Sequence, residues 1–164
     1  MSGPDPFSMV VVADTSPLNY LVLIGHIEIL PRLYTRILIP PAVLAELNHP
    51  AAPEPVHYWA SHPPRWLEVL APKSRVDIAE LDLGEIEAIA LATEMQVQAL
   101  LIDDRAGREE ALRRGLRVAG TLSVLDEADQ AGLVDFEAAV IRLRQTSFRV
   151  STAVLTAIAE RRSR

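Results

Sequence analysis

The sequence predicts an α/β fold in which helices cover both faces of a parallel sheet. Short apolar runs with the length of buried strands alternate with longer segments of helical periodicity. The turns between these segments are short, and a parallel sheet connected in this way is buried on both faces. With 164 residues, 49% of them hydrophobic, the chain has the size of one ordinary domain with a substantial core.

Proline is confined to the first half of the chain, since all 12 Pro lie at or before residue 72, and we expect it to interrupt helices and strands there. We expect Ser16 to cap the first helix, with Pro17 in its first turn and Gly25 at its end. The expected elements are a strand at 9–13, helices at 16–24 and near 27–33, a strand at 36–39, a helix at 41–47, a loop or lid at 48–64 with a short helix near 56–60, and a short edge strand at 66–70.

The second half reads as continuous alternation of helices and strands. Gly115 and Gly132 are expected to end two of the helices, and Ser151 to cap the last one. The expected elements are a helix at 83–95, a strand at 99–102, a helix at 104–114, a strand at 116–119, and helices at 121–130, 136–144 and 152–161.

The domain boundaries follow from these elements. Residues 1–8 have the character of an expression scar before a native start at Met9. Residues 9–164 are expected to form one domain, in which 131–164 are a C-terminal helical extension. No apolar run approaches the roughly 20 residues that cross a membrane, and no secretion signal is visible, so we expect a cytoplasmic protein.

Composition and charge narrow the function classes. The chain has no Cys, which excludes disulfides and thiolate metal sites. The net charge of −6 argues against strong non-specific binding of nucleic acid. Residues 1–100 carry 5 basic and 12 acidic groups, whereas residues 101–164 carry 11 basic and 10 acidic groups. This asymmetry leaves room for a basic region beside an acidic pocket, or for Arg residues on solvated helix faces.

Two predicted strands end on carboxylates. Asp14 follows the first strand, and Asp103 and Asp104 follow the strand at 99–102. In an open α/β sheet, ligands bind beyond the carboxyl ends of the strands where the strand order reverses. Carboxylates in such a crevice are costly unless a cation binds them, so the pattern predicts a hard divalent metal and phosphate-ester chemistry. We expect Asp104 to face the crevice and Asp103 to assist or to cap the next helix.

Helical carboxylates are the next candidates. Glu46 shares a partly apolar helix face with Val43, although an exposed position is equally consistent with the sequence. Glu87 aligns with Leu83 and Leu91, so it interrupts an apolar stripe and is expected to be functional. Glu85 lies two residues away and is expected to point elsewhere.

Other polar residues give weaker signals. The four His residues lack the spacing of helical metal ligands and are expected to be structural or exposed. Arg105 and Arg108 are candidates for phosphate contact, or equally for pairing with carboxylates such as Glu109 on the same helix.

Several segments, in this order and spacing, resemble the PIN-domain family, which includes the VapC-like toxin ribonucleases. They cover most of residues 9–130, and the stretch 146–151 with the last two helices resembles a bacterial subgroup of that family. The matching segments are Val-Val-Ala-Asp14-Thr-Ser16-Pro-Leu, Ile-Pro-Pro-Ala-Val-Leu-Ala-Glu46-Leu, Leu83-Gly84-Glu85-Ile-Glu87-Ala-Ile-Ala-Leu-Ala, Leu-Leu-Ile-Asp103-Asp104-Arg105 and Gly120-Thr121-Leu122.

The resemblance implies a three-layer α/β/α fold with a parallel sheet of four to five strands in the order 3-2-1-4-5. It also implies Mg²⁺ or Mn²⁺, cleavage of RNA, a homodimer and a cognate antitoxin. The acidic positions of the family fall on Asp14, Glu46, Glu87 and Asp104, with Ser16 in support; Asp103 is a further metal candidate and Glu85 a further supporting one. Two departures are Glu87, where toxin members typically have Asp, and Ile102, where Ser or Thr is common.

We therefore expect a divalent-metal-dependent ribonuclease, of the kind that forms the toxin of a toxin–antitoxin pair. The alternative is a PIN-like module that binds nucleic acid or protein with little or no nuclease activity, as the two departures and the acidic charge suggest. A phosphotransfer domain ranks third, because the residues after Asp14 are Thr15 and Ser16, and the sole Lys, Lys73, precedes the strand at 99–102.

Overall fold

A parallel sheet of five strands forms the centre of the molecule. The computed structural model describes residues 8–74 and 77–163. The strand order is β3-β2-β1-β4-β5, and every neighbouring pair is parallel, which confirms the predicted sheet. The prediction of an expression scar at 1–8 lies, except for Ser8, outside the described residues. The strands are β1 (Val10–Ala13), β2 (Arg36–Ile39), β3 (Leu67–Val69), β4 (Ala99–Leu101) and β5 (Val118–Ala119).

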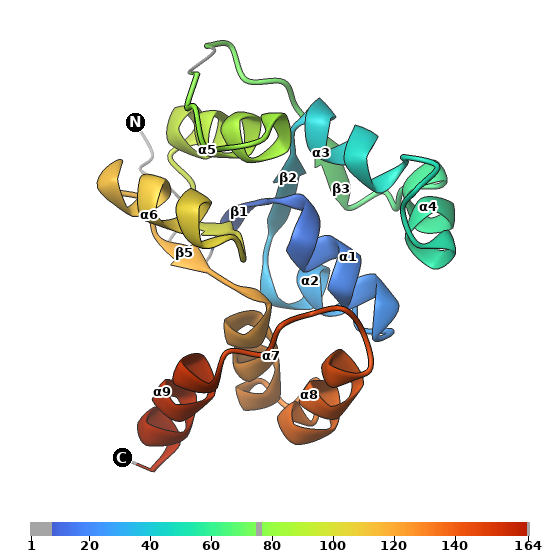
Figure 1. Cartoon of the computed structure of the whole chain (residues 1–164), viewed down its shortest axis with the longest axis vertical. Helices are drawn as coiled ribbons and strands as arrows, with labels where there is room; N and C mark the ends of the chain where they lie inside the picture. Colours follow the sequence, from blue (N-terminus) through green and yellow to red (C-terminus); the bar gives the residue numbers. More distant parts are fainter. Residues whose placement is uncertain (1–7, 75–76, 164) are drawn as a thin grey trace.

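Helices pack on both faces of the sheet, as Figure 1 shows. Most begin where the sequence offers a start signal: Pro41 occupies the first turn of its helix, and Asp135 and Ser151 accept hydrogen bonds from backbone N–H groups of theirs. The helices are α1 (Thr15–Leu23), α2 (Ile29–Leu33), α3 (Pro41–Leu47), α4 (Glu54–Ser61), α5 (Leu83–Met95), α6 (Arg105–Arg113), α7 (Thr121–Gln130), α8 (Phe136–Arg144) and α9 (Thr152–Arg162).

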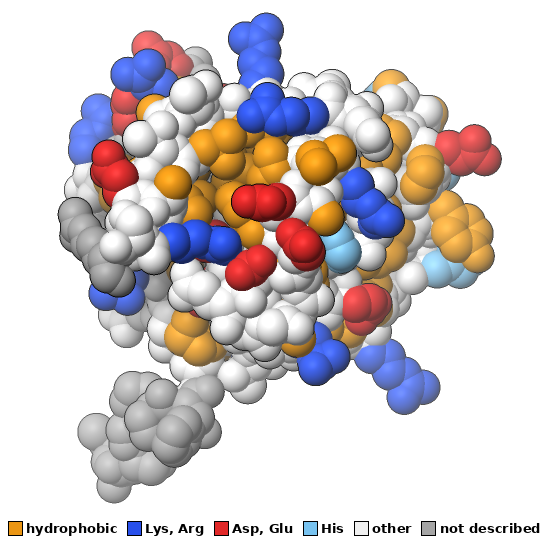
Figure 2. Space-filling view, turned by 90° about the horizontal axis from the view of Figure 1, so that it is seen from below, with side chains coloured by type: hydrophobic (Ala, Val, Ile, Leu, Met, Phe, Trp, Pro, Cys, Tyr) orange, Lys and Arg blue, Asp and Glu red, His pale blue; other side chains and the backbone are white. Residues whose placement is uncertain are grey.

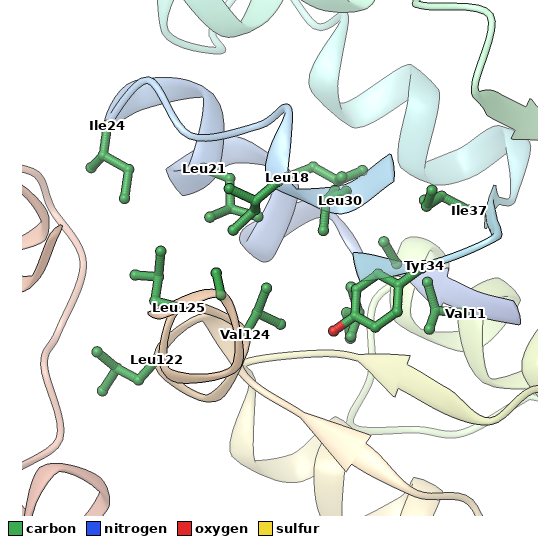
Figure 3. Close-up of a cluster of buried hydrophobic side chains, with 14 of the residues drawn as sticks. Val11, Leu18, Leu21, Ile24, Leu30, Tyr34, Ile37, Leu122, Val124 and Leu125 are labelled. Carbon is green, nitrogen blue, oxygen red and sulfur yellow. The ribbon is translucent and has the colours of Figure 1, made fainter. Parts of the chain in front are cut away.

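Alternation along the strands divides the core into two layers. In β1, Val11 and Ala13 face the larger cluster, and Val12 faces the smaller one. The smaller cluster lies under α5 and α6, while the other helices contribute to the larger one. Figure 3 shows part of the larger cluster, where Leu122 and Leu125 of α7 lie opposite Leu21 of α1. Burial on both faces explains why the strand sequences are continuously apolar.

The strand order places the ends of β1 and β4 side by side. Val12 pairs with Leu100 and Ala13 with Leu101, while the opposite edge of β1 pairs with β2. The chain therefore leaves β1 toward one edge of the sheet and later returns to β4 on the other side. This reversal creates the crevice at the carboxyl ends of the strands where ligands bind in open α/β sheets.

Acidic and basic side chains are interspersed on the surface. On the face drawn in Figure 2, acidic side chains gather beside a hydrophobic hollow, and Lys or Arg side chains lie around them. This face therefore does not present a continuous basic surface. Among the described residues, no helix has the length and apolar character needed to span a membrane.

Candidate active site

Asp14 lies at the end of β1, in the crevice beside β4. Its backbone N–H donates a hydrogen bond to the carbonyl of Leu101 over 2.8 Å. The residue is 5% exposed, and Oδ1 has no hydrogen-bond partner among the described residues. Burial is the main cause that raises the pKa of Asp14 to about 7, and the neighbouring carboxylates of Asp82 and Glu46 raise it further. A buried carboxylate in a negative environment favours the binding of a cation or a proton.

Ser16 does not cap the first helix, contrary to expectation. Helix α1 begins at Thr15, and Asp14 occupies the cap position without a capping hydrogen bond from its side chain. The Ser16 hydroxyl instead donates to Asp103 Oδ2 over 2.7 Å, and Thr121 donates to Asp103 through both its backbone N–H and its hydroxyl, at 2.7 Å each. Asp103 thus joins the starts of α1 and α7 at the end of β4, and its side chain does not cap α6.

Asp104, not Asp103, caps helix α6. Its Oδ2 accepts a hydrogen bond from the backbone N–H of Gly107 over 3.0 Å. The expected alternative in which Asp103 caps this helix is therefore wrong, and the cap is provided by Asp104. Its charge nevertheless reaches the crevice, because it helps to raise the pKa of Glu85. One carboxylate oxygen of Asp104 is used by the helix, and the other makes no hydrogen bond with a described residue.

Glu46 projects from α3 toward the end of β1 and the first turn of α5. Its Oε2 accepts a short hydrogen bond from the hydroxyl of Thr15, the first residue of α1. A Cβ atom at position 84 would lie 2.6 Å from Glu46 Oε1, so a larger residue there would force the Glu46 carboxylate to move from its present position. Burial is the main cause that raises the pKa of Glu46, followed among the charges by Asp82 and Glu87.

Of the two candidates on α5, Glu85 lies in the site and Glu87 lies at its edge, the reverse of what the sequence predicts. Glu85 has a buried Oε2 without a hydrogen-bond partner among the described residues. Burial raises its pKa to about 9, and the carboxylates of Asp82, Asp104 and Asp14 contribute further. Glu87 lies against α3, where its Oε1 accepts a long hydrogen bond of 3.4 Å from the backbone N–H of Ala42. The expectation that Glu85 points away from the site is therefore wrong.

The burial of α5 explains this reversal. The consecutive residues 88–92 are all buried, so the helix is covered around its circumference rather than along one stripe. A helical apolar stripe identifies a buried face only when another face meets solvent. Gly107 on α6 also matters, since a Cβ atom there would lie 3.0 Å from Glu85 Oε2. The close approach of α6 to α5 is thus part of what encloses Glu85.

Asp82 is a further carboxylate of the site, which the sequence patterns did not identify. It is the cap residue of α5, and its Oδ1 accepts a hydrogen bond from the backbone N–H of Glu85 over 2.8 Å. Its charge contributes to the raised pKa values of Asp14, Glu46 and Glu85. An Asp three residues before a Glu at the start of an apolar helix is a capping signal that could have drawn attention to it. We refer to Asp14, Glu46, Asp82, Glu85 and Asp104 as the acidic cluster.

A cavity of about 670 Å³ lies beside the acidic cluster, and we call it the α6 cavity. Asp103 and Asp104 line it together with Arg105 and Arg108. Arg105 is 93% exposed and pairs with Glu109 over 3.2 Å, whereas Arg108 forms no ion pair with a described residue. The expected pairing with Glu109 is thus confirmed for Arg105, and contact of either arginine with phosphate stays a prediction.

The acidic cluster has the donor chemistry for a hard divalent cation. Its ligands would be carboxylate oxygens, which suit Mg²⁺ or Mn²⁺. Two buried oxygens, Asp14 Oδ1 and Glu85 Oε2, accept no hydrogen bond within the described part of the chain, and no described Lys or Arg forms an ion pair with the cluster. No three Asp, Glu or His side chains within 8–74 and 77–163 are already arranged to hold an ion. The residues fit a divalent metal in charge and donor type, and holding one would require their side chains to move closer together.

Comparison with known proteins agrees with the fold. The family model described as "DUF3368: PIN domain" matches residues 10–164. The chain belongs to the PIN-domain family. A solved structure of a PilT N-terminus domain protein, SSO1118, from the hyperthermophilic archaeon Sulfolobus solfataricus P2 is similar, with a TM-score of 0.54 and 16% identity over 73% of this chain and 93% of that one. No curated protein sequence matches this chain.

Membership of the PIN-domain family supports a nuclease-type protein and confirms the resemblance predicted from the sequence. The archaeal structure supports the fold alone, since its identity to this chain is only 16%. Divalent metals are typical of PIN domains, in agreement with the donor chemistry of the acidic cluster.

Proposed function

We propose that this PIN domain is a divalent-metal-dependent endoribonuclease that hydrolyses RNA phosphodiester bonds at the acidic cluster. The supporting observation is the acidic cluster at the ends of β1 and β4, in which Asp14 is buried, Glu46 and Glu85 are half-buried, and two oxygens, Asp14 Oδ1 and Glu85 Oε2, have no hydrogen-bond partner among the described residues. Such a site is unfavourable as an anion cluster and becomes favourable when a cation offsets its charge. Mg²⁺ or Mn²⁺, when bound, would supply Lewis-acid chemistry that acidifies water and offsets charge on the phosphate.

The proposed site contains metal ligands and further residues that hold these ligands in position. Asp14, Glu46, Glu85 and Asp104 are the proposed metal ligands, with Glu87 at the edge of the site beside α3. Thr15 orients Glu46 through its hydroxyl. Further support comes from Asp103, which holds the end of β4 to α1 and α7 through Ser16 and Thr121. Arg108 is the proposed phosphate contact at the mouth of the site, and Arg105 a second one once it leaves Glu109.

Cleavage of RNA by purified protein tests this function. Structured and single-stranded RNA are incubated with Mn²⁺, Mg²⁺ or EDTA, beside Asp14→Asn prepared in the same way. We expect cleavage with either metal, none in EDTA, and a loss of at least about 100-fold in the variant. Equal activity of both proteins would assign the cleavage to a contaminant and contradict the proposal.

We further propose that the enzyme is the toxin of a toxin–antitoxin pair, and that it acts in the cytoplasm as a homodimer with a cognate antitoxin. The resemblance to VapC-like ribonucleases supports this part of the proposal. Light scattering of the purified protein tests the dimer. Expression in a bacterial host with and without the adjacent gene tests the toxin role, and growth unaffected by expression would contradict it.

A binding module with little nuclease activity is the second candidate. It is favoured by the capping role of Asp104 and by the raised pKa of Glu85, which leaves this carboxyl protonated near neutral pH without a cation. In that case Asp14→Asn would retain RNA or protein binding, and neither metal would support cleavage.

A further inference from the structure

The α6 cavity has a mixed lining that suits a nucleotide. Carboxylates lie at its end near the acidic cluster, and the guanidinium groups of Arg108 and Arg149 line its walls. Neither arginine forms an ion pair with a described residue, so both are available to an anion. Serine residues, among them Ser123 and Ser147, and the aromatic residues Tyr20 and Phe148 also line the cavity. Cations, hydroxyls and an aromatic ring together are the groups that bind phosphate, sugar and base.

The segment between α8 and α9 forms one wall of the α6 cavity. Phe148 and Tyr20 of α1 are in edge contact, with ring centroids 5.0 Å apart, and the hydroxyls of Tyr20 and Ser147 are 2.8 Å apart. Thr146 fixes the turn, because its hydroxyl donates to the carbonyl of Leu143 and accepts from the backbone N–H of Phe148. This wall is therefore attached to α1 rather than free in solvent.

Helix α9 is attached to the domain by an ion pair between an exposed arginine and a buried carboxylate. Asp126 of α7 is 3% exposed, and its Oδ1 accepts hydrogen bonds from Arg162 over 2.8 and 2.5 Å. The same guanidinium lies over the ring of Phe136, 4.8 Å from its centroid. With α8 and α9 both held, the wall between them is preorganised, which lowers the entropic cost of binding.

We infer that the α6 cavity binds one nucleotide of a single-stranded RNA next to the scissile phosphate, with Arg108 and Arg149 on phosphates and Phe148 stacked on the base. This inference rests on the proposed nuclease function for the position of the scissile bond. A cavity of about 670 Å³ suits a ligand of nucleotide size. A base reaches the ring of Phe148 only when it is unpaired, so a duplex cannot use this site.

Binding measured without catalysis tests the inference. A fluorescein-labelled single-stranded RNA of 12 nucleotides and its blunt duplex are titrated with full-length protein in EDTA, and anisotropy is followed at several KCl concentrations. The variants are Arg108→Gln, Arg149→Gln and Phe148→Leu. Matched controls are Arg65→Gln and Tyr58→Leu, at exposed positions outside the cavity lining.

Each Arg→Gln change in the cavity is expected to weaken binding of the single strand by about 5- to 10-fold and to reduce the slope of log K against log salt by about 0.7. Phe148→Leu is expected to weaken binding by about 5-fold or more with no change in that slope. The controls should stay within about twofold of the original protein. Thermal unfolding of Phe148→Leu, whose side chain is partly buried, checks that the fold persists.

The outcomes separate the inference from the proposed function. Cavity variants that bind like the controls, tighter binding of the duplex, or no binding of the single strand would overturn the inference, even if the protein cleaves RNA. Loss of binding in the Arg variants supports it, even if neither metal supports cleavage, in which case only the nuclease proposal fails.

Discussion

Replacing Asp14 by Asn should make the stability of the protein less dependent on pH. Asp14 is 5% exposed in the folded protein, where its pKa is about 7. In the unfolded chain, where the side chain meets water, its pKa is the ordinary 3.8. The folded state therefore retains a proton that the unfolded chain loses, and folding stability falls as the pH rises through this interval. The Asn side chain of Asp14→Asn does not titrate, so position 14 no longer contributes to the dependence of folding stability on pH.

The size of the effect follows from the difference in pKa. A shift of about three units corresponds to about 4 kcal/mol of stability lost when the pH rises from below 4 to above 7. Between pH 5 and pH 8 the expected change is about 3 kcal/mol. The buried amide of Asn costs about 1–3 kcal/mol at every pH, so the variant should be less stable than the original protein at pH 5 and about as stable or more stable at pH 8.

Chemical denaturation in EDTA measures this difference. Unfolding by urea is followed through the fluorescence of Trp59 and Trp66 at pH 5, 6, 7 and 8. Asp103→Asn is the matched control, because the Asp103 carboxylate accepts hydrogen bonds from Ser16 and Thr121 and its replacement should cost about 1–3 kcal/mol at pH 8. A free-energy difference between Asp14→Asn and the original protein that stays constant from pH 5 to pH 8 would refute the burial of a proton-retaining carboxyl at position 14.

Three further changes test the site and its supports. Glu85→Gln should reduce the initial rate of RNA cleavage by at least about 100-fold, and Glu87→Gln by less than about 10-fold. A larger loss in Glu87→Gln than in Glu85→Gln would indicate that Glu87, not Glu85, is the metal ligand on α5. Gly84→Ala places a Cβ atom 2.6 Å from a carboxylate oxygen of Glu46, so the flexible Glu46 side chain must shift; we expect weaker Mn²⁺ binding with a change of less than about 1 kcal/mol in urea unfolding, and unchanged Mn²⁺ affinity would contradict the close approach. Arg162→Ala leaves the buried Asp126 without its nearest cation and should cost about 1–3 kcal/mol of stability above pH 5, whereas unchanged unfolding would show that α9 is not held by this pair.

The fold could be predicted from the sequence because its signals are local. Apolar runs in β1 and β2 end before Asp14 and Pro40, β4 lies in the apolar run 99–102 that ends before Asp103, and Pro41 and Ser151 mark helix starts. The carboxylates at strand ends were also predictable, since the topology of a parallel sheet brings the ends of neighbouring strands together. Asp14 and the pair Asp103 and Asp104 were identified in this way.

The assignment of roles within the site depends on tertiary contacts that the sequence does not display. Ser16 has the residue type of a helix cap, and only the approach of β4 gives its hydroxyl the stronger partner Asp103. Glu85 and Glu87 both lie on a helix that is buried all round, so periodicity could not choose between them. The small residues Gly84 and Gly107 leave room beside the carboxylates of Glu46 and Glu85, and this is visible only when the helices are packed.

Titration calorimetry of Mn²⁺ binding tests most directly whether the acidic cluster is a divalent-metal centre. The original protein, Asp14→Asn and Glu85→Gln are titrated at pH 7 in two buffers with different heats of ionisation, which reveals proton release. We predict saturable binding to the original protein with release of protons, because the cation displaces those held by Asp14 and Glu85, and a large loss of affinity in both variants. Binding of equal strength in all three proteins, or no saturable binding to the original one, would contradict a metal centre at the ends of β1 and β4.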